Sequence, residues 1–182
     1  MSLTDTWTGF SDTLKKVPEK RKRLIGVIAF TLAYPAMQLG IQYIPNPMVP
    51  GANIALNMIF PVLAGYFFGP WSGAVAGGAG TGIASLLNGS MYTILAIIPQ
   101  SIMGAVAGWT GRYRSEFLTA STILIGHSLN MLFYLGTGVI TIPAGMAGET
   151  LLGLATESMI DIVAIVILIL LLKRYLYCTE RW

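Results

Sequence analysis

The sequence predicts an all-α integral membrane protein with six transmembrane helices and with both termini in the cytoplasm. Two features of its composition indicate a bilayer. Of the 182 residues, 54% are hydrophobic and only 10% are charged, whereas a soluble domain has roughly 25% charged residues. The hydrophobic residues also form long runs that are almost free of charge, each near the roughly 20 residues that a spanning helix needs.

Six hydrophobic runs follow one another along the chain, and the second and third are short. The expected helices are Leu24–Ile44, Asn53–Phe68, Trp71–Asn88, Met91–Gly111, Phe117–Ile142 and Thr150–Leu172. We therefore expect a cytoplasmic N-terminal segment at 1–23 that is amphipathic or disordered, a membrane domain at 24–174 and a cytoplasmic tail at 175–182.

The basic residues predict the orientation in the membrane. They precede the first helix (Lys15, Lys16, Lys20, Arg21, Lys22, Arg23), separate the fourth and fifth (Arg112, Arg114) and follow the sixth (Lys173, Arg174, Arg181). A chain that starts inside and crosses at every expected helix places all three groups on one side, as the positive-inside rule requires of the cytoplasmic face. An even number of spans in a bacterial or archaeal cytoplasmic (inner) membrane is the simple solution.

Proline and glycine mark the connections between the expected helices. The segment Pro45–Gly51 holds three prolines, which lack backbone donors and restrict their neighbours, so it should form an outer loop. Gly69–Pro70 leaves a very short inner turn, which predicts an antiparallel hairpin of the second and third helices. Small residues that recur every four positions allow helix backbones to approach closely. Such glycines stand at Gly69, Gly73 and Gly77 and at Gly104 and Gly108.

Ionisable residues inside the expected spans are the first candidates for function, because a charge near the bilayer centre costs roughly 2.5–3.5 kcal/mol. Glu157 and Asp161 stand at i and i+4 and therefore share one face of the last helix. At about 1.5 Å per residue from Thr150, they lie roughly 10 Å and roughly 16 Å below its outer end. His127 and Asn130 lie midway along the fifth helix. We expect Glu157 to reach a ligand and Asp161 to support the floor of its site.

Further polar side chains gather toward the outer side and, with these four residues, predict a cavity that is open to the outside. The additional candidate binding residues are Asn53, Asn57, Asn88, Gln42 and Tyr92. Any one of the amides can instead make an interhelical hydrogen bond, and His127 can simply satisfy Asn130 or a backbone carbonyl. Because no basic residue is expected within the membrane, the ligand should be neutral or cationic.

Several functions are excluded by missing motifs. No Lys lies between Arg23 and Lys173, so the chain has no P-loop and cannot bind ATP in that manner. Neither His-Glu-x-x-His nor Gly-x-Ser-x-Gly occurs. The single cysteine, Cys178, excludes an internal disulfide framework and a multi-cysteine metal site. We therefore expect no enzyme activity, no cofactor, no resident metal and no nucleic-acid partner.

One local run, together with the length and the six expected helices, resembles a known family. Leu63–Ala74 reads Leu-Ala-Gly-Tyr-Phe-Phe-Gly-Pro-Trp-Ser-Gly-Ala and follows a basic start and a loop rich in proline and glycine. In these features the chain is similar to S-components, the substrate-binding membrane subunits of energy-coupling factor (ECF) type vitamin transporters. Ala29 and Ala33 resemble the family's Ala-x-x-x-Ala contact with its coupling subunit, although Pro35 directly after them departs from that pattern.

The resemblance implies a protein that binds a vitamin or a related small molecule near the outer surface, beneath the first loop. A membrane coupling subunit and two cytoplasmic ATPase subunits would supply the work, which agrees with the missing nucleotide site. No motif in the sequence is specific for biotin, riboflavin or folate. Which substrate is bound, and whether the energising module is dedicated or shared, are therefore not predicted.

Two other classes of function stay open at the level of sequence. The chain can be an accessory or assembly protein whose small-residue faces bind other membrane subunits without any ligand. It can also be an intramembrane enzyme that uses Glu157, Asp161 and His127 for acid–base or metal chemistry, since three mixed ligands can hold a metal if the helices converge.

Overall fold

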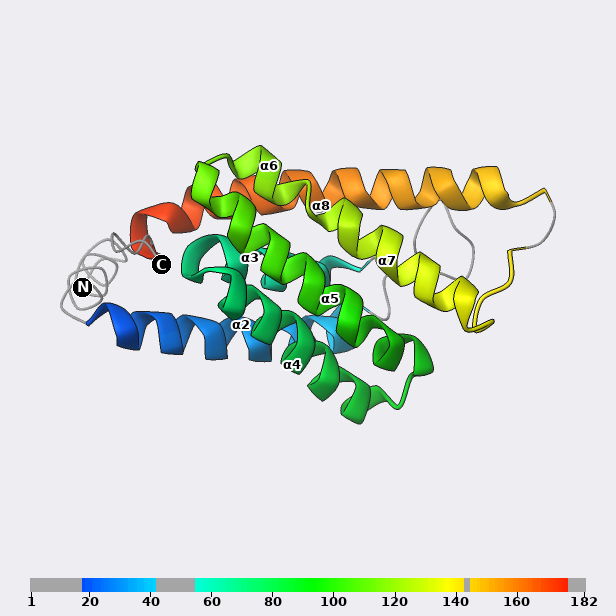
Figure 1. The fold of residues 1–182 in the computed structure, drawn as a ribbon, viewed down its shortest axis with the longest axis horizontal. Helices are drawn as coiled ribbons and strands as arrows, with labels where there is room; N and C mark the ends of the chain where they lie inside the picture. Colours follow the sequence, from blue (N-terminus) through cyan, green and yellow to red (C-terminus); the bar gives the residue numbers. More distant parts are fainter. Residues whose placement is uncertain (1–17, 42–54, 143–144, 177–182) are drawn as a thin grey trace, which may run out of the picture.

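The computed structural model describes residues 18–41, 55–142 and 145–176, which form a bundle of helices (Figure 1). Every regular element within these ranges is helical, so the all-α prediction is confirmed. The elements are α2 (Glu19–Ile41), the 3-10 turn η1 (Leu56–Met58), α3 (Ile59–Phe68), α4 (Pro70–Asn88), α5 (Met91–Thr110), the 3-10 turn η2 (Gly111–Tyr113), α6 (Glu116–Ala120), α7 (Ile123–Gly136) and α8 (Ala147–Leu176).

Four helical segments are long and apolar enough to cross a membrane. They are Lys20–Gly40, Met91–Tyr113, Glu116–Gly136 and Ala147–Lys173. The apolar segment Leu56–Phe68 is shorter, and the glycine-rich α4 has 19 residues. The protein is a multi-pass membrane protein, and the count of six spans stays a prediction.

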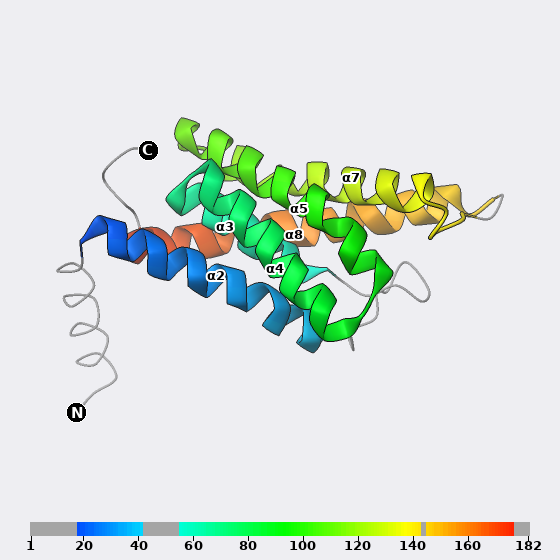
Figure 2. The same cartoon turned by 60° about the horizontal axis from the view of Figure 1, so that its bottom comes forward.

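The short helix α3 lies in the middle of the bundle, where α2, α4, α5 and α8 pack against it (Figure 2). Apart from Phe60, all of its residues are buried. Its Val62, Leu63 and Phe67 join Met103 of α5 and Ile165 of α8 in one apolar core. Because its surface is covered by other helices rather than by lipid, α3 does not need the length of a helix that faces the bilayer on its own.

Glycines bring the backbones of α3, α4 and α5 into direct contact. A Cβ atom added to Gly73 would overlap the carbonyl oxygen of Gly104, and one added to Gly108 would overlap the backbone of Pro70. The tight turn between α3 and α4 also needs glycine, because Gly69 has a φ of +99°. The predicted hairpin and the predicted close approach of the glycine faces are therefore both confirmed.

The prediction of one continuous helix over 117–142 is wrong, because this part of the chain forms two helices and ends its helical structure earlier. It is divided into α6 and α7 by a turn at residues 121 and 122, and it ends at Gly136. The hydroxyl of Thr137 donates to the carbonyl of Phe133 at 2.7 Å, and Gly138 has a φ of +72°. A backbone in the left-handed region after a satisfied last turn ends a helix, even though apolar residues continue to Ile142.

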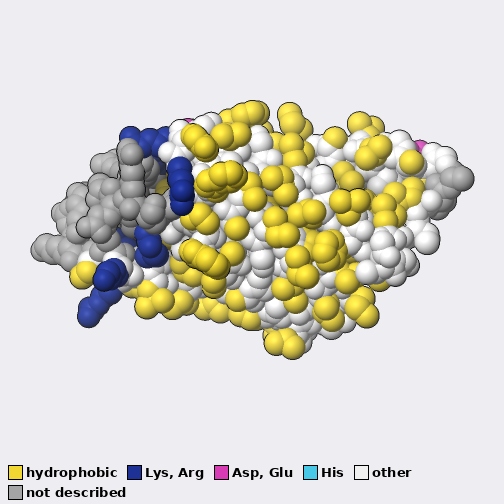
Figure 3. Space-filling view, viewed as in Figure 1, with side chains coloured by type: hydrophobic (Ala, Val, Ile, Leu, Met, Phe, Trp, Pro, Cys, Tyr) yellow, Lys and Arg dark blue, Asp and Glu magenta, His cyan; other side chains and the backbone are white. Residues whose placement is uncertain are grey.

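The beginning of α2 and the end of α8 lie at the same end of the bundle (Figure 1). On the face drawn in Figure 3, the Lys and Arg side chains gather at this end as well. The described chain therefore crosses the bundle an even number of times, as the expected distribution of basic residues requires.

The orientation predicts which surface positions react with a membrane-impermeant thiol reagent. In a Cys178→Ser background, a cysteine in place of Thr141 should be labelled from outside intact cells, because it follows α7 at the end away from the basic residues. A cysteine in place of Tyr113, beside Arg112 and Arg114, should be labelled only after the cells are permeabilised. Labelling of the Tyr113 position in sealed cells would contradict the cytoplasmic placement of η2.

The glycine contacts predict a second result. Gly73→Ala should lower the thermal stability in detergent by about 1–3 kcal/mol, because the added methyl group meets backbone that cannot move aside. Gly82 lies in the same helix and has no atom within 4 Å of an added Cβ, so Gly82→Ala is the matched control and should leave the stability unchanged or slightly raised. Equal melting temperatures for the two variants would show that α4 and α5 are not held by this contact.

Candidate functional site

The two carboxylates in the middle of α8 point into the protein, while several apolar residues of the helix point out. Glu157 is 6% exposed and Asp161 is fully buried, whereas Met159, Ile160 and Val163 are exposed. This is the reverse of the pattern in a soluble helix, and it is the arrangement expected of a helix whose outer face meets lipid. The predicted shared face of the two carboxylates is therefore an interior face.

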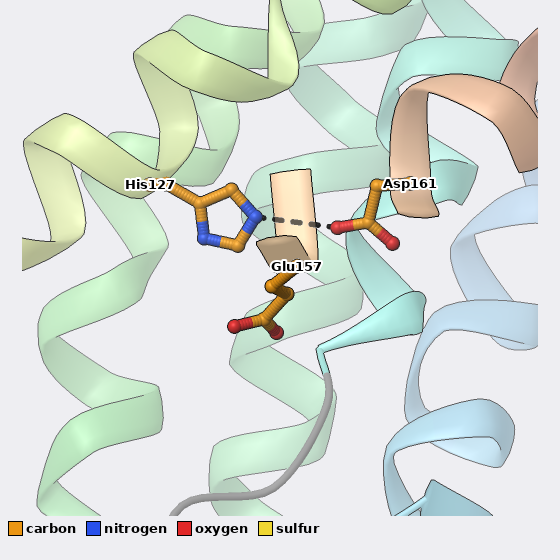
Figure 4. Close-up of side chains that lie close together, drawn as sticks. All are labelled: His127, Glu157 and Asp161. Atoms are coloured by element: carbon orange, nitrogen blue, oxygen red, sulfur yellow. Dashed lines mark hydrogen bonds and ion pairs between the residues drawn. The ribbon is translucent and has the colours of Figure 1, made fainter. Parts of the chain in front are cut away.

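The helix α7 brings His127 to the same place. Nε2 of His127 lies 3.2 Å from Oδ2 of Asp161, and both side chains are buried (Figure 4). The residue before the histidine is Gly126, and a Cβ atom at that position would overlap the side chains of Met103 and Met58. Because Gly126 allows α7 to pack closely on the core, the imidazole of the next residue, His127, lies against Asp161 of α8.

Glu157 completes a group of three side chains, which we call the buried triad: His127, Glu157 and Asp161. One ligand atom from each residue lies within 4.8 Å of the other two. An oxygen of Glu157 also accepts a hydrogen bond from the backbone N–H of Ala55, just before η1. The triad thus connects α7, α8 and the segment that leads into α3.

The buried triad carries more acid than base. Two carboxyl groups face one imidazole, and the described Lys and Arg residues belong to the beginning of α2, to η2 and its neighbour Arg114, and to the end of α8. Burying an uncompensated charge costs several kcal/mol, so the excess negative charge has to be neutralised by a proton or by a bound cation. The site is suited to hydrogen-bond donors and to positive charge.

A pair of amides involves Asn57, which lies two residues after Ala55, the residue whose backbone N–H binds Glu157. Nδ2 of Asn57 donates a hydrogen bond to Oε1 of Gln38 in α2, and Asn57 is buried. Oδ1 of Asn57 and Oδ1 of Asn130 are both buried and have no hydrogen-bond partner among the described residues. These two candidates therefore offer acceptors to a ligand or to water.

Two other candidates occupy the turn between α4 and α5. Oδ1 of Asn88 accepts from the backbone N–H of Ser90 at 3.0 Å, and its amide donates to the hydroxyl of Thr93 at 3.2 Å. The ring of Tyr92 packs edge-on against Tyr134 with their centroids 5.4 Å apart. The described contacts of Asn88 are thus local, whereas those of Tyr92 join α5 to Tyr134 of α7, at the end of the bundle that is expected to face outside.

The remaining candidates differ in what can be said of them. Asn53 and Gln42 lie outside the described residues. Ala29 is exposed and Ala33 is half-buried on α2, among exposed apolar residues such as Ile25 and Leu32. This surface is open to lipid or to another membrane protein, as the expected contact with a coupling subunit requires.

Sequence reasoning missed Gln100. It is 1% exposed in the middle of α5, and its Oε1 has no hydrogen-bond partner among the described residues. The available signal was an amide directly after Pro99 inside an otherwise apolar run. A polar side chain at such depth is a functional candidate by the same argument that singled out Glu157.

The comparisons with known proteins identify the family. The family model for the S component of the ECF-type riboflavin transporter matches residues 22–177. No curated protein and no solved structure matched the chain. The family match runs from the first turn of α2 to the end of α8 and includes every residue of the buried triad. On this evidence the chain belongs to the family of S components of ECF-type riboflavin transporters.

Proposed function

We propose that this S component captures riboflavin from outside the cell and delivers it inward with a membrane coupling subunit and two cytoplasmic ATPase subunits. The match of the riboflavin family over residues 22–177 is the observation that carries the proposal. The family consists of transporter subunits and not of enzymes, so the buried triad is interpreted as a binding site rather than a catalytic one.

The chemistry of riboflavin suits the site. The vitamin is uncharged, and it presents an imide N–H on its ring and several hydroxyl groups on its ribityl chain. These donors match the carboxylate oxygens of Glu157 and the unpaired amide oxygens of Asn57 and Asn130. The phosphorylated form of the vitamin carries negative charge, so it would be repelled by the two carboxylates of a triad that holds no cation and should then be rejected.

Within this proposal the residues have different roles. Glu157 accepts a hydrogen bond from the ligand, while Asp161 holds His127 and supports the floor beneath it. Asn57 and Asn130 would bind the ligand beside the triad. The remaining members of the proposed binding set are Asn53, Asn88, Gln42 and Tyr92. The cellular location that we propose is the cytoplasmic membrane of a bacterium or archaeon.

Titration of the purified protein with riboflavin tests the substrate. Quenching of the vitamin's fluorescence should show saturable binding, and the phosphorylated vitamin, thiamine and biotin should not compete at equal concentration. A charged hydrogen bond is worth about 1.5–3 kcal/mol, so Glu157→Gln should weaken riboflavin binding by roughly ten- to a hundred-fold. Asp161→Asn should instead act more on the melting temperature, since it breaks a buried pair.

The exposed residue Glu149 provides the control for this titration, since it lies on the same helix toward the outer end. Glu149→Gln should bind riboflavin as the unmodified protein does. If Glu157→Gln bound riboflavin with unchanged affinity and melted at a lower temperature, Glu157 would be a packing residue. If the well-folded protein bound none of the vitamins tested, the proposed function would be lost in favour of an accessory protein without a ligand.

The exposed face of α2 predicts a variant that separates binding from transport. Replacing both Ala29 and Ala33 with Trp should block the close approach of a partner helix while leaving the distant triad intact, because Ala29 points away from the protein core. Cells that carry this double variant should lose riboflavin uptake, whereas the purified variant should keep its affinity. Val163→Trp, a bulky change on the exposed face of α8, should transport normally. Full uptake by the double variant would place the coupling surface elsewhere.

A further inference from the structure

The buried triad has the donor set of a metal site, which the sequence analysis left open only for an intramembrane enzyme. We propose that Nε2 of His127, a carboxylate oxygen of Asp161 and a carboxylate oxygen of Glu157 bind one divalent transition-metal ion of the zinc class. Imidazole and carboxylate ligands in a mixed set of three are typical of zinc sites that keep a fourth position open. This inference goes beyond the proposed uptake of riboflavin and does not depend on the identity of the vitamin.

The separations of the three side chains suit a small ion. Zinc binds nitrogen and oxygen ligands at about 2.0–2.2 Å, so two ligands of a tetrahedral ion lie roughly 3.4 Å apart. Nε2 of His127 and Oδ2 of Asp161 are 3.2 Å apart, and the ligand atom of Glu157 is within 4.8 Å of both. The difference between 4.8 Å and roughly 3.4 Å is about 1.4 Å, so a movement of the Glu157 carboxylate by no more than this closes the site. A side chain with several rotatable bonds can supply such a movement.

An independent observation concerns the second oxygen of Asp161. This side chain is fully buried, yet its Oδ1 has no hydrogen-bond partner among the described residues. A buried carboxylate oxygen without a donor costs free energy, and it is rarely left in that state without a reason. A cation bound by both oxygens of this carboxylate would compensate Oδ1, which the described residues leave unsatisfied, as well as Oδ2.

The charges of the triad balance around a divalent ion. Two ionised carboxylates and a neutral imidazole sum to the charge that one such ion cancels. The backbone N–H of Ala55 already holds one oxygen of Glu157. Such a hydrogen bond from outside the coordination shell orients the ligand and is a regular part of metal sites in proteins.

The composition of the chain makes the test unusually specific. His127 is the only histidine among the 182 residues and Cys178 is the only cysteine. Once the purification tag is removed and bound metal is stripped with a chelator, Co²⁺ can be added as a spectroscopic probe and Zn²⁺ can be titrated calorimetrically. We expect one ion per chain, with visible absorption bands of four- or five-coordinate Co²⁺ and no charge-transfer band from a thiolate.

Variants of the triad then decide the location of the ion. His127→Asn and Glu157→Gln should each weaken Zn²⁺ binding by more than about tenfold, and Glu149→Gln should leave it unchanged. Asp161→Asn is informative only if it folds, so Glu157→Gln is the main variant because it keeps the shape of the side chain. Melting curves recorded with and without Zn²⁺ should show stabilisation of the unmodified protein and none of His127→Asn.

Two results would overturn the metal site. One is a stripped, folded protein that binds neither ion, and the other is affinity that stays the same in His127→Asn and Glu157→Gln. Riboflavin binding is measured by fluorescence on the same metal-free samples. The proposed riboflavin uptake and the proposed metal site are therefore tested by separate measurements. Binding of the vitamin without binding of metal would leave the uptake function and remove the metal site, whereas metal binding without vitamin binding would do the reverse.

Discussion

The fold depends on the contact of helix backbones at glycine. Gly73 of α4 lies against Gly104 of α5, and Gly65 of α3 lies against the same stretch of α5. Lipid provides no hydrophobic force that pushes helices together, so association in a membrane relies on close packing of this kind. The three helices form a tight centre, and the other elements are placed by their contacts with it.

The position of the site follows from this centre. Gly126 lets α7 approach Met103 of α5 and Met58 of η1 closely, and this approach presents His127 to Asp161. The segment before α3 presents the N–H of Ala55 to Glu157. Three separate parts of the chain therefore hold the triad, and the rigidity of the core keeps its atoms within a few ångströms of one another.

A substrate-binding membrane subunit without a nucleotide site needs two distinct surfaces, and this chain separates them. The buried triad is inside the bundle, whereas Ala29 of α2, which we propose to meet a coupling subunit, is exposed. Burying a carboxylate in a bilayer costs free energy. Two carboxylates on one face of α8 therefore lower the stability of the folded protein, but they also provide groups that can bind a ligand. The proposed metal ion would reduce this cost by cancelling their charge.

The sequence by itself determined the fold class, the glycine faces, the hairpin at Gly69–Pro70 and the shared face of Glu157 and Asp161, because hydropathy, proline geometry and helical periodicity are local properties. It did not determine that α7 ends at Gly136, since the backbone turn at Gly138 overrides the apolar residues that follow. Nor did it determine that His127 meets Asp161 across 34 residues. Which residues of two helices meet depends on how both pack against a third, and only the tertiary structure decides that contact.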